Sequence, residues 1–343
     1  MGSRTAQFLL MVCVMLGVNG CQAKNDAMLP VRILPGPSGP FEYDDVEWLD
    51  HGLVVEYLPQ DRSKRYLLSA KLGRVDVQSG KLEMLRLPDY PGCEHNGFEA
   101  PVRMPDGRLA YIVRCLPPGV YVWQLYMMAF DPQTEHVTPL LSYTLPSRQV
   151  GSGGYSWNPD MSRGITSDGN GAGLSEQLYW ITPDHWEPLD VGLPQALGSD
   201  WSPDGTKIAF VGAPEQGLEG VGRADAVFNL YLMKPDGSDR HSLLTGFRYP
   251  SPVSWSRDSH WIVFNATFGR LLTQTGLWLV DVDTGKRFLI APGYFSTPAW
   301  SPDGSQLVSL QTTGSYPNDH TKLVILDIGK LLERLRNKAK IVR

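Results

Sequence analysis

The stretch that decides the fold is Trp201-Ser-Pro-Asp-Gly205, which Thr-Lys-Ile-Ala-Phe210 follows. It returns as Trp300-Ser-Pro-Asp-Gly304 and, in altered form, as Trp255-Ser-Arg-Asp-Ser259. In such a turn Pro presets φ, Asp accepts hydrogen bonds from nearby backbone amides, and Gly tolerates a positive φ. Each copy therefore predicts a tight turn that leads into a β-strand.

Three weaker copies lie upstream, so the motif repeats along most of the chain. They are Trp157-Asn-Pro-Asp-Met161, Arg103-Met-Pro-Asp-Gly107 and the degenerate Trp48-Leu-Asp-His-Gly52. The six copies begin 55, 54, 44, 54 and 45 residues apart. A second strand pair with its own turn follows most copies, as around Asp283-Thr-Gly-Lys286. Four strands in each of six units predict an all-β fold, a six-bladed β-propeller over residues 31–328.

The repeat W-S-P-D-G-x-x-[IL]-[AV] resembles the WD40-like (PD40) repeat of the TolB-like β-propellers. The resemblance covers roughly residues 31–328 and is strongest over 198–328. It implies a six-bladed propeller in the bacterial cell envelope. It implies less about function, because propellers host many unrelated tasks.

The N-terminus predicts export and a lipid anchor. Residues 1–20 have the features of a signal peptide, with an apolar run from Phe8 to Val18 that is too short to span a bilayer. Val18-Asn-Gly-Cys21 resembles the lipobox of bacterial lipoproteins, in which the Cys is lipidated. Residues 21–30 would then be a tether, at the periplasmic face of the outer membrane or at the cell surface. The alternative is an ordinary signal peptide with a chance Cys21.

Charge and cysteine content narrow the partners further. A net charge of −5 and an isoelectric point near 5.8 disfavour a nucleic-acid partner, and we expect a monomer. Once Cys13 has left with the signal peptide and Cys21 is lipidated, Cys93 and Cys115 remain. In an oxidising compartment we expect a disulfide between them. Two separate buried thiols are the alternative.

The last unit lacks a strand, and this predicts how the propeller closes. After Leu323-Val-Ile-Leu-Asp327 no further strand follows, whereas Val31-Arg-Ile-Leu34 is a strand without a partner. We predict that it forms the outer strand of the last blade. Residues 329–343 have six Lys or Arg against one Glu and predict a basic helix or tail. A solvated cap is the simpler interpretation of this tail, and a helix that docks on lipid or a partner is the alternative.

Candidate binding residues lie on the segments that lead into each first strand, at the face opposite the Pro-Asp-Gly turns. Function concentrates on variable loops held by a rigid scaffold. The candidates are Tyr43, Asp44, Glu47, Tyr155, Asp200, Arg248, Tyr249, Tyr294 and Phe295. For any one of them, ordinary packing is the competing interpretation.

Catalytic and metal motifs are weak. No G-x-S-x-G elbow or H-E-x-x-H zinc motif occurs, and the seven His residues lack ligand spacing, so we expect no metal and no cofactor. The repeated turn aspartates are expected to be structural. They are Asp106, Asp160, Asp204, Asp258 and Asp303.

Two functions remain open. The first is a membrane-anchored, non-catalytic module that binds or scaffolds an envelope protein. The second is a glycan-binding or glycan-cleaving enzyme, a lyase or glycosidase, that uses acidic residues at the channel mouth. A glycosidase needs two convergent carboxyl groups, and Glu47 and Asp200 are the pair that the sequence offers.

Overall fold

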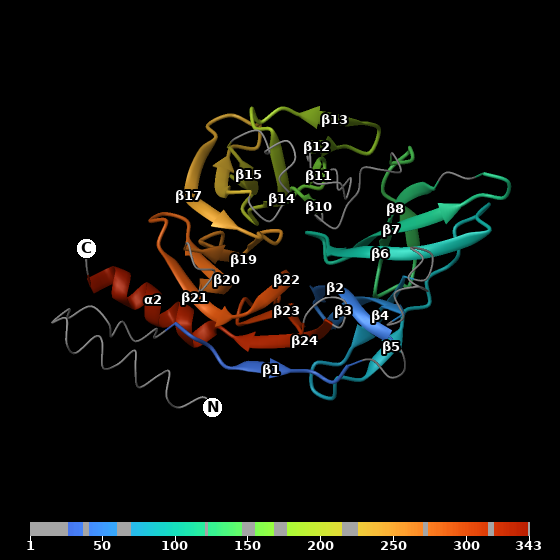
Figure 1. Ribbon diagram of the computed structural model, residues 1–343. Helices are drawn as coiled ribbons and strands as arrows, with labels where there is room; N and C mark the ends of the chain where they lie inside the picture. Colours follow the sequence, from blue (N-terminus) through green and yellow to red (C-terminus); the bar gives the residue numbers. More distant parts are fainter. Residues whose placement is uncertain are drawn as a thin grey trace.

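Antiparallel sheets stand around a central axis in the computed structural model of the chain (Figure 1). The structure describes residues 27–36, 41–59, 70–120, 123–145, 155–167, 177–214, 226–269, 274–314 and 319–341. The signal peptide and Cys21 lie outside these residues. The predicted all-β fold built of four-stranded sheets is confirmed.

Four sheets have four strands each. Three follow chain order from the axis outward: β2 (Phe41–Leu49), β3 (Gly52–Pro59), β4 (Lys71–Val75) and β5 (Leu82–Met84); β6 (His95–Arg103), β7 (Leu109–Leu116), β8 (Gln124–Phe130) and β9 (Val137–Pro139); β10 (Tyr155–Trp157), β11 (Gly164–Ser167), β12 (Leu178–Ile181) and β13 (Trp186–Leu189). The fourth sheet contains β22 (Tyr294–Trp300), β23 (Gln306–Thr313), β24 (His320–Asp327) and β1 (Val31–Ile33).

The remaining strands form one eight-stranded sheet, where the repeats predict two separate blades. Its strands are β14 (Gln195–Trp201), β15 (Ile208–Ala213), β16 (Phe228–Met233), β17 (His241–Arg248), β18 (Ser254–Trp255), β19 (Trp261–Phe268), β20 (Gln274–Asp281) and β21 (Arg287–Pro292). β17 bends at Gly246, where φ is +79°, and its last two residues pair with Phe268 and Thr267 of β19. The outer strand of one unit thus reaches the next unit.

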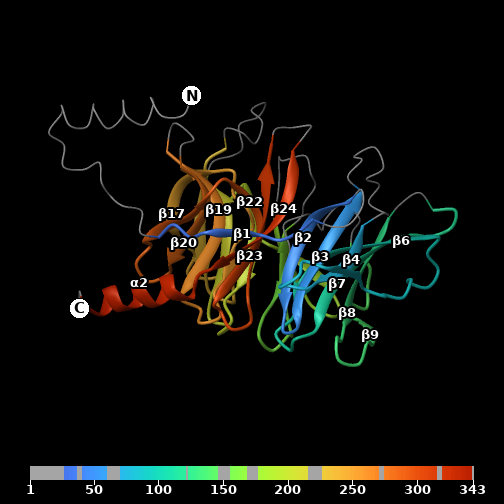
Figure 2. The ribbon, with the colours of Figure 1, turned by 90° about the horizontal axis from the view of Figure 1, so that it is seen from below.

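The ends of the chain meet in the last sheet, as the missing strand predicted. Val31 pairs with Leu326 and Ile33 with Val324, so β1 forms the outer edge beside β24 (Figures 1 and 2). Just before β1, the Leu29 N–H donates to the Ile290 carbonyl at 2.8 Å. This closure joins the first and last units without a covalent bond.

The turns of the repeat share one hydrogen-bond pattern. Ser202 Oγ donates to Asp204 Oδ1 at 2.7 Å and accepts the Lys207 N–H at 2.9 Å. Ser256 with Asp258, and Ser301 with Asp303, make the same contacts. Gly205 and Gly304 have φ near +70°, a conformation that glycine adopts without strain. The Ser-x-Asp part of the motif therefore stabilises the turn itself. All five repeated aspartates lie in these first turns; Asp106 and Asp160 also accept a backbone N–H two residues on.

Two further features stabilise opposite sides of the ring. Cys93 and Cys115 form a disulfide, with Cα atoms 5.4 Å apart. Helix α2 (Gly329–Ile341) lies at the rim near β21 (Figure 1), where Leu331 and Leu332 are buried in one cluster with Trp261 and Ala27. Residues 329–341 of the predicted tail thus form a helix that packs on the body through Leu331, Leu332 and Leu335.

Candidate binding site in the channel

A cavity of about 460 Å³ lies on the axis, and the innermost segment of every unit lines it. The lining comes from the ends of β2, β6, β10, β14 and β22, from the segment around β18, and from the turns that follow. Pro105, Pro159 and Pro203 belong to the repeat turns, so the cavity extends toward the turn end of the channel.

Bulges aim polar side chains at this axis. The register of β2 shifts between Tyr43 and Asp45, and that of β14 shifts between Leu197 and Asp200. β6 and β22 have equivalent shifts, and Ala100 and Thr297 there have positive φ. A bulge redirects the side chains that follow it, which explains why acidic residues reach the channel wall.

The acidic side chains of β2 dominate one side of the channel. Burial, together with the neighbouring charges of Asp44 and Glu47, raises the pKa of Asp45 to about 8, although its carboxylate accepts the Val46 N–H at 2.7 Å. Burial also raises the pKa of Glu47, opposed by Arg257 and by a 2.7 Å hydrogen bond from the Trp48 N–H. Desolvation by the surrounding protein raises the pKa of Asp44 too, although its side chain is exposed and is not part of the cavity lining.

Asp200 reaches the same cavity from β14. Its carboxylate accepts the Trp255 N–H at 2.9 Å. Burial raises its pKa to about 7, and the charge of Glu47 contributes to this rise. The predicted pair of Glu47 and Asp200 therefore lines one cavity, and the two carboxylates interact electrostatically.

Further charged groups surround the β2 carboxylates. Burial raises the pKa of Glu56 well above its usual value, and the nearby Asp44, Asp45 and Glu99 add to the effect. Glu99 in turn accepts two hydrogen bonds from Arg114, at 3.0 and 2.7 Å, and both residues are buried. The channel thus contains buried carboxyl groups that are easily protonated near neutral pH.

Hydrogen bonds between side chains and backbone also link each repeat unit to the next. They follow one another around the axis from the innermost strands, with Glu56 of β3, Asn265 of β19 and Thr321 of β24 as the partners from other strands. They are Ala100 N to Glu56 Oε2 (2.8 Å), Tyr155 Oη to Ala100 O (3.0 Å), Trp201 N to Ser156 Oγ (2.9 Å), Trp255 N to Asp200 Oδ2 (2.9 Å), Phe295 N to Asn265 Oδ1 (3.1 Å) and Thr321 N to Glu42 Oε1 (3.2 Å). We call this set the inter-sheet ring.

The other predicted binding residues lie away from the cavity lining. Tyr43 and Phe295 are buried in hydrophobic clusters. Arg248 is the last residue of β17, and Tyr249 follows it with φ at +51°. Tyr294 is exposed at the start of β22. Of the nine predicted residues, the structure brings Glu47, Tyr155 and Asp200 to the cavity.

Two arginines at the cavity were missed by the sequence reasoning. Arg103 lines it from the end of β6, and Arg257 lines it from the turn after β18. Burial lowers the pKa of Arg257, and the nearby charge of Arg103 lowers it further. The signal was present in the repeat, because Arg103 stands where the other units have Trp and Arg257 stands where four of them have Pro.

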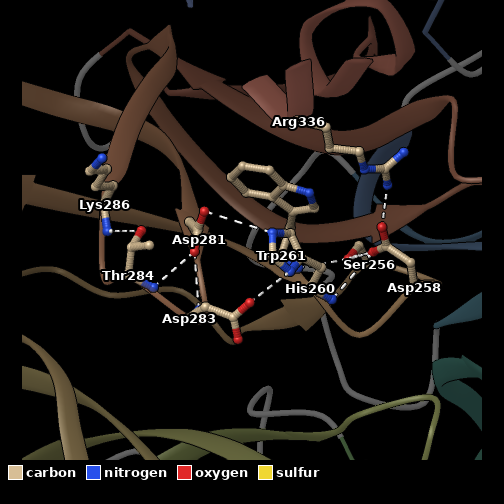
Figure 3. A network of polar contacts seen from close by, with 9 residues as sticks. All are labelled: Ser256, Asp258, His260, Trp261, Asp281, Asp283, Thr284, Lys286 and Arg336. Atoms are coloured by element: carbon tan, nitrogen blue, oxygen red, sulfur yellow. Dashed lines mark hydrogen bonds and ion pairs between the residues drawn. The ribbon is translucent and has the colours of Figure 1, made fainter. Parts of the chain in front are cut away.

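One group outside the channel has metal-ligand chemistry. His260, Asp281 and Asp283 place one ligand atom each within 4.8 Å of the others (Figure 3). Asp281 Oδ1 already accepts the N–H groups of Asp283 and Thr284, at 3.0 and 2.9 Å, as turn aspartates do. These contacts account for the group without a metal ion.

Comparison with solved structures identifies the architecture. TolB from Acinetobacter baumannii is similar with a TM-score of 0.51 and 12% identity, over 84% of this chain and 80% of that chain. The fold is a TolB-like β-propeller. Two further solved structures are similar to this chain to about the same degree. An α-L-arabinofuranosidase from Fusarium graminearum has a TM-score of 0.57 at 10% identity, over 89% of this chain and 99% of that chain. Regucalcin, a calcium-binding protein from Agrobacterium tumefaciens, has a TM-score of 0.52 at 13% identity, over 87% of this chain and 93% of that chain.

Sequence comparisons add no family for this TolB-like propeller. No protein-family model and no curated protein matches the chain. Among the described residues, no helix is long and apolar enough to cross a membrane. At these identities the likeness shows the fold, so function has to be argued from the channel.

Proposed function

We propose that this chain is a lipid-anchored, extracytoplasmic propeller that binds a protein partner in the bacterial cell envelope without catalysis. The eight-stranded sheet counts as two blades in this proposal, which gives six blades around the axis. Six innermost segments line the cavity, and this supports that count.

The inter-sheet ring is the observation that carries the binding role. The carboxylates of Glu56 and Asp200 accept backbone N–H groups of the neighbouring unit. A buried N–H left without its partner costs about 1–3 kcal/mol, so these carboxylates are needed where they are. A channel wall tied together in this way is a rigid frame, and rigid frames present loops and cavities to a partner at low entropic cost.

The position of the first described residues agrees with an anchor at Cys21. Ala27 is buried in the cluster that contains α2, and Leu29 is hydrogen-bonded to β21. Ala27 is six positions after Cys21. At about 3.5 Å per extended residue, a lipidated Cys21 would hold the propeller within about 20 Å of the membrane surface. A partner would then have to lie close to the same membrane.

A glycan-cleaving enzyme is the second candidate, and the raised carboxyl pKa values favour it. A general acid needs a carboxyl group that is still protonated near neutral pH. Asp45, with a pKa of about 8, and Asp200, with a pKa of about 7, meet this condition and line one cavity with Glu47. Turnover of envelope or plant polysaccharides that disappears in Asp200→Asn would establish this candidate.

In-cell crosslinking followed by affinity purification of the membrane-extracted protein tests the binding role. We expect one recurrent envelope protein with the native chain. It should be lost or strongly reduced with Cys21→Ser, because the untethered propeller no longer lies at the membrane. Recovery of no stable partner with the native chain would contradict the proposal and would move the search to glycans.

A further inference from the structure

The two arginines of the channel break the repeat at two places that line one cavity. Three units place Pro105, Pro159 and Pro203 at the turn end of the cavity, and the fifth unit places Arg257 at the same point of the motif. The second unit has Arg103 where the others have Trp. The fold needs neither change, since four other units have Pro at the Arg257 position and all five other units have Trp at the Arg103 position.

Arg257 has donors but no acceptor. Its Nε–H is buried, and no described residue accepts a hydrogen bond from this atom. Within the described residues, no ion pair or hydrogen bond to its guanidinium occurs either. A guanidinium has five N–H donors, and buried donors are nearly always paired in folded proteins. Arg257 therefore has a buried Nε–H without an acceptor at the wall of the cavity, although the charges of Glu47, Asp200 and Asp50 lie near its guanidinium.

Arg103 is only partly paired. Its Nη2 donates to Asp50 Oδ1 at 2.8 Å, and this leaves its buried Nε–H without an acceptor. The side chain is 17% exposed, whereas that of Asp50 is 48% exposed. The ion pair is therefore at the protein surface, and the unpaired edge of Arg103 is on its buried side.

We propose that the turn end of the channel binds a carboxylate, held between the guanidinium groups of Arg103 and Arg257. The assignment deepens the proposed binding function and rests on it, because it names the chemical group of the partner that enters the channel. The occupant is the C-terminal end of a peptide chain. Arginine pairs with a carboxylate through two parallel N–H···O bonds, which would use the donors that now lack partners.

The surrounding carboxyl groups favour a carboxylate over a phosphate. Asp45, Glu47 and Asp200 line the same cavity and would repel a doubly charged group. The same carboxyl groups repel a single negative charge less, the two arginines attract it, and a protonated Asp45 or Asp200 can donate a hydrogen bond to it. The charges at the site therefore favour an anion with one charge over an anion with two.

Size and wall chemistry favour a chain end. A volume of about 460 Å³ is within the range of about 300–1,000 Å³ that is usual for small-ligand pockets. Pro101, Pro105, Pro159 and Pro203 form apolar parts of the wall. They can contact the aliphatic part of the last residues while the arginines hold the carboxylate.

Calorimetric titration of the mature protein with matched probes tests the assignment. The first pair is acetyl-Gly-Pro-Leu with a free carboxylate and the same peptide with a C-terminal amide. The second pair is D-glucuronate and D-glucose. The variants are Arg257→Gln and Arg103→Gln, and the control is Arg86→Gln, which removes an exposed arginine outside the cavity. Unfolding midpoints check that each variant is folded.

We expect the peptide acid to bind at least tenfold more tightly than its amide. Arg257→Gln should abolish the difference, and Arg86→Gln should preserve it. Binding of glucuronate but not of the peptide acid would support the carboxylate site and would contradict the proposed protein-binding function. If neither acid binds better than its neutral counterpart, or if both channel variants bind like the native protein, the carboxylate site is wrong. That result would leave the crosslinking test of the proposed function unaffected.

Discussion

The strands from Gln195 to Asp327 and those from Phe41 to Leu189 build the same kind of sheet by different means. In the first region, three turns repeat one arrangement of Ser, Asp and backbone, centred on Ser202, Ser256 and Ser301. In the second region the motif is weak, and a disulfide and a buried ion pair contribute instead. The regular region shows what the fold requires, and the irregular region shows what has been added to it.

Most charged groups of the channel belong to the irregular region. Asp45, Glu47, Glu56, Glu99 and Arg103 all come from its first two sheets. The regular region contributes Asp200 and Arg257, and Arg257 is itself a departure from the motif. Departures from the repeat therefore coincide with the cavity, which is why we assign binding to them.

The buried ion pair of the irregular region should have the largest effect on stability. Arg114→Met leaves the Glu99 carboxylate buried without its partner, and we expect a loss of about 3–5 kcal/mol in the free energy of unfolding. Urea denaturation measures it. The double variant Glu99→Leu with Arg114→Met is the control and should recover most of the loss. Equal losses in the single and double variants would show that packing, and not charge, is responsible.

Removal of the disulfide should have the next largest effect on stability. Cys93 and Cys115 are 22 residues apart, and removing a bridge of that span costs about 3 kcal/mol. We expect the Cys93→Ser, Cys115→Ser variant to unfold at lower urea concentration. No change in the midpoint, compared with the native protein treated with reductant as a control, would show that the bridge adds nothing to stability.

The two classes of carboxylate should respond to pH in opposite directions. The pKa of Asp200 is raised on folding, so its contribution to stability is fully present below the unfolded value of 3.8 and falls as pH rises to about 7. The slope is about 1.4 kcal/mol per pH unit for one group. The pKa of the turn residue Asp303 is lowered, so its contribution is present above 3.8 and is lost as pH falls.

Thermal unfolding from pH 3 to pH 9 separates these contributions. Asp200→Asn retains an acceptor for the Trp255 N–H and should flatten the decline between pH 5 and pH 7. Asp303→Asn should change the stability only at acid pH, where the native protein loses the contribution of this carboxylate. A decline that is unchanged in Asp200→Asn would contradict the raised pKa of this group.

A single turn of the regular region should contribute less. Asp303 accepts hydrogen bonds from Ser301 Oγ at 2.7 Å and from the Ser305 N–H at 2.9 Å. We expect Asp303→Ala to cost about 1 kcal/mol at neutral pH, since the turn is exposed to water. Chemical denaturation measures the change. The comparison is Asp283→Ala, in a turn of the same regular region that lies outside the repeat motif. A loss above 3 kcal/mol would mean that the turn is needed for the whole fold.

The contact between α2 and the repeat should contribute least. Arg336 pairs with Asp258 in the turn after β18 (Figure 3), and the two side chains are 47% and 39% exposed. Exposed ion pairs contribute about 0.2–1 kcal/mol. Arg336→Ala should therefore lower the unfolding midpoint only slightly, whereas Leu331→Ala, which opens a buried site, should lower it clearly. If Arg336→Ala lowered the unfolding midpoint more than Leu331→Ala, the ion pair and not the apolar contact would hold α2 on the body.

The fold could be predicted from sequence because Trp-Ser-Pro-Asp-Gly encodes a turn at fixed intervals. The closing strand Val31–Ile33 was predictable because the last unit lacked one. The joined sheet was not, since it depends on a bend at Gly246 that carries β17 past its own unit. The sequence also predicts Glu47 and Asp200 as an acidic pair at the channel. It does not predict Arg103 and Arg257 there, because only the folded ring shows that these two positions of the repeat line the cavity.

Restoring the repeat at its exception tests the central claim most directly. Arg257→Pro gives the fifth unit the residue that Pro203 provides in the fourth, at a position whose N–H makes no backbone hydrogen bond within the described residues. The account predicts an unfolding midpoint equal to or above that of the native protein. It also predicts at least a tenfold loss in affinity for acetyl-Gly-Pro-Leu in the same preparation. A folded Arg257→Pro protein that binds this peptide as well as the native chain, or one that fails to fold, would contradict the claim that the repeat carries the fold and its departures carry the binding.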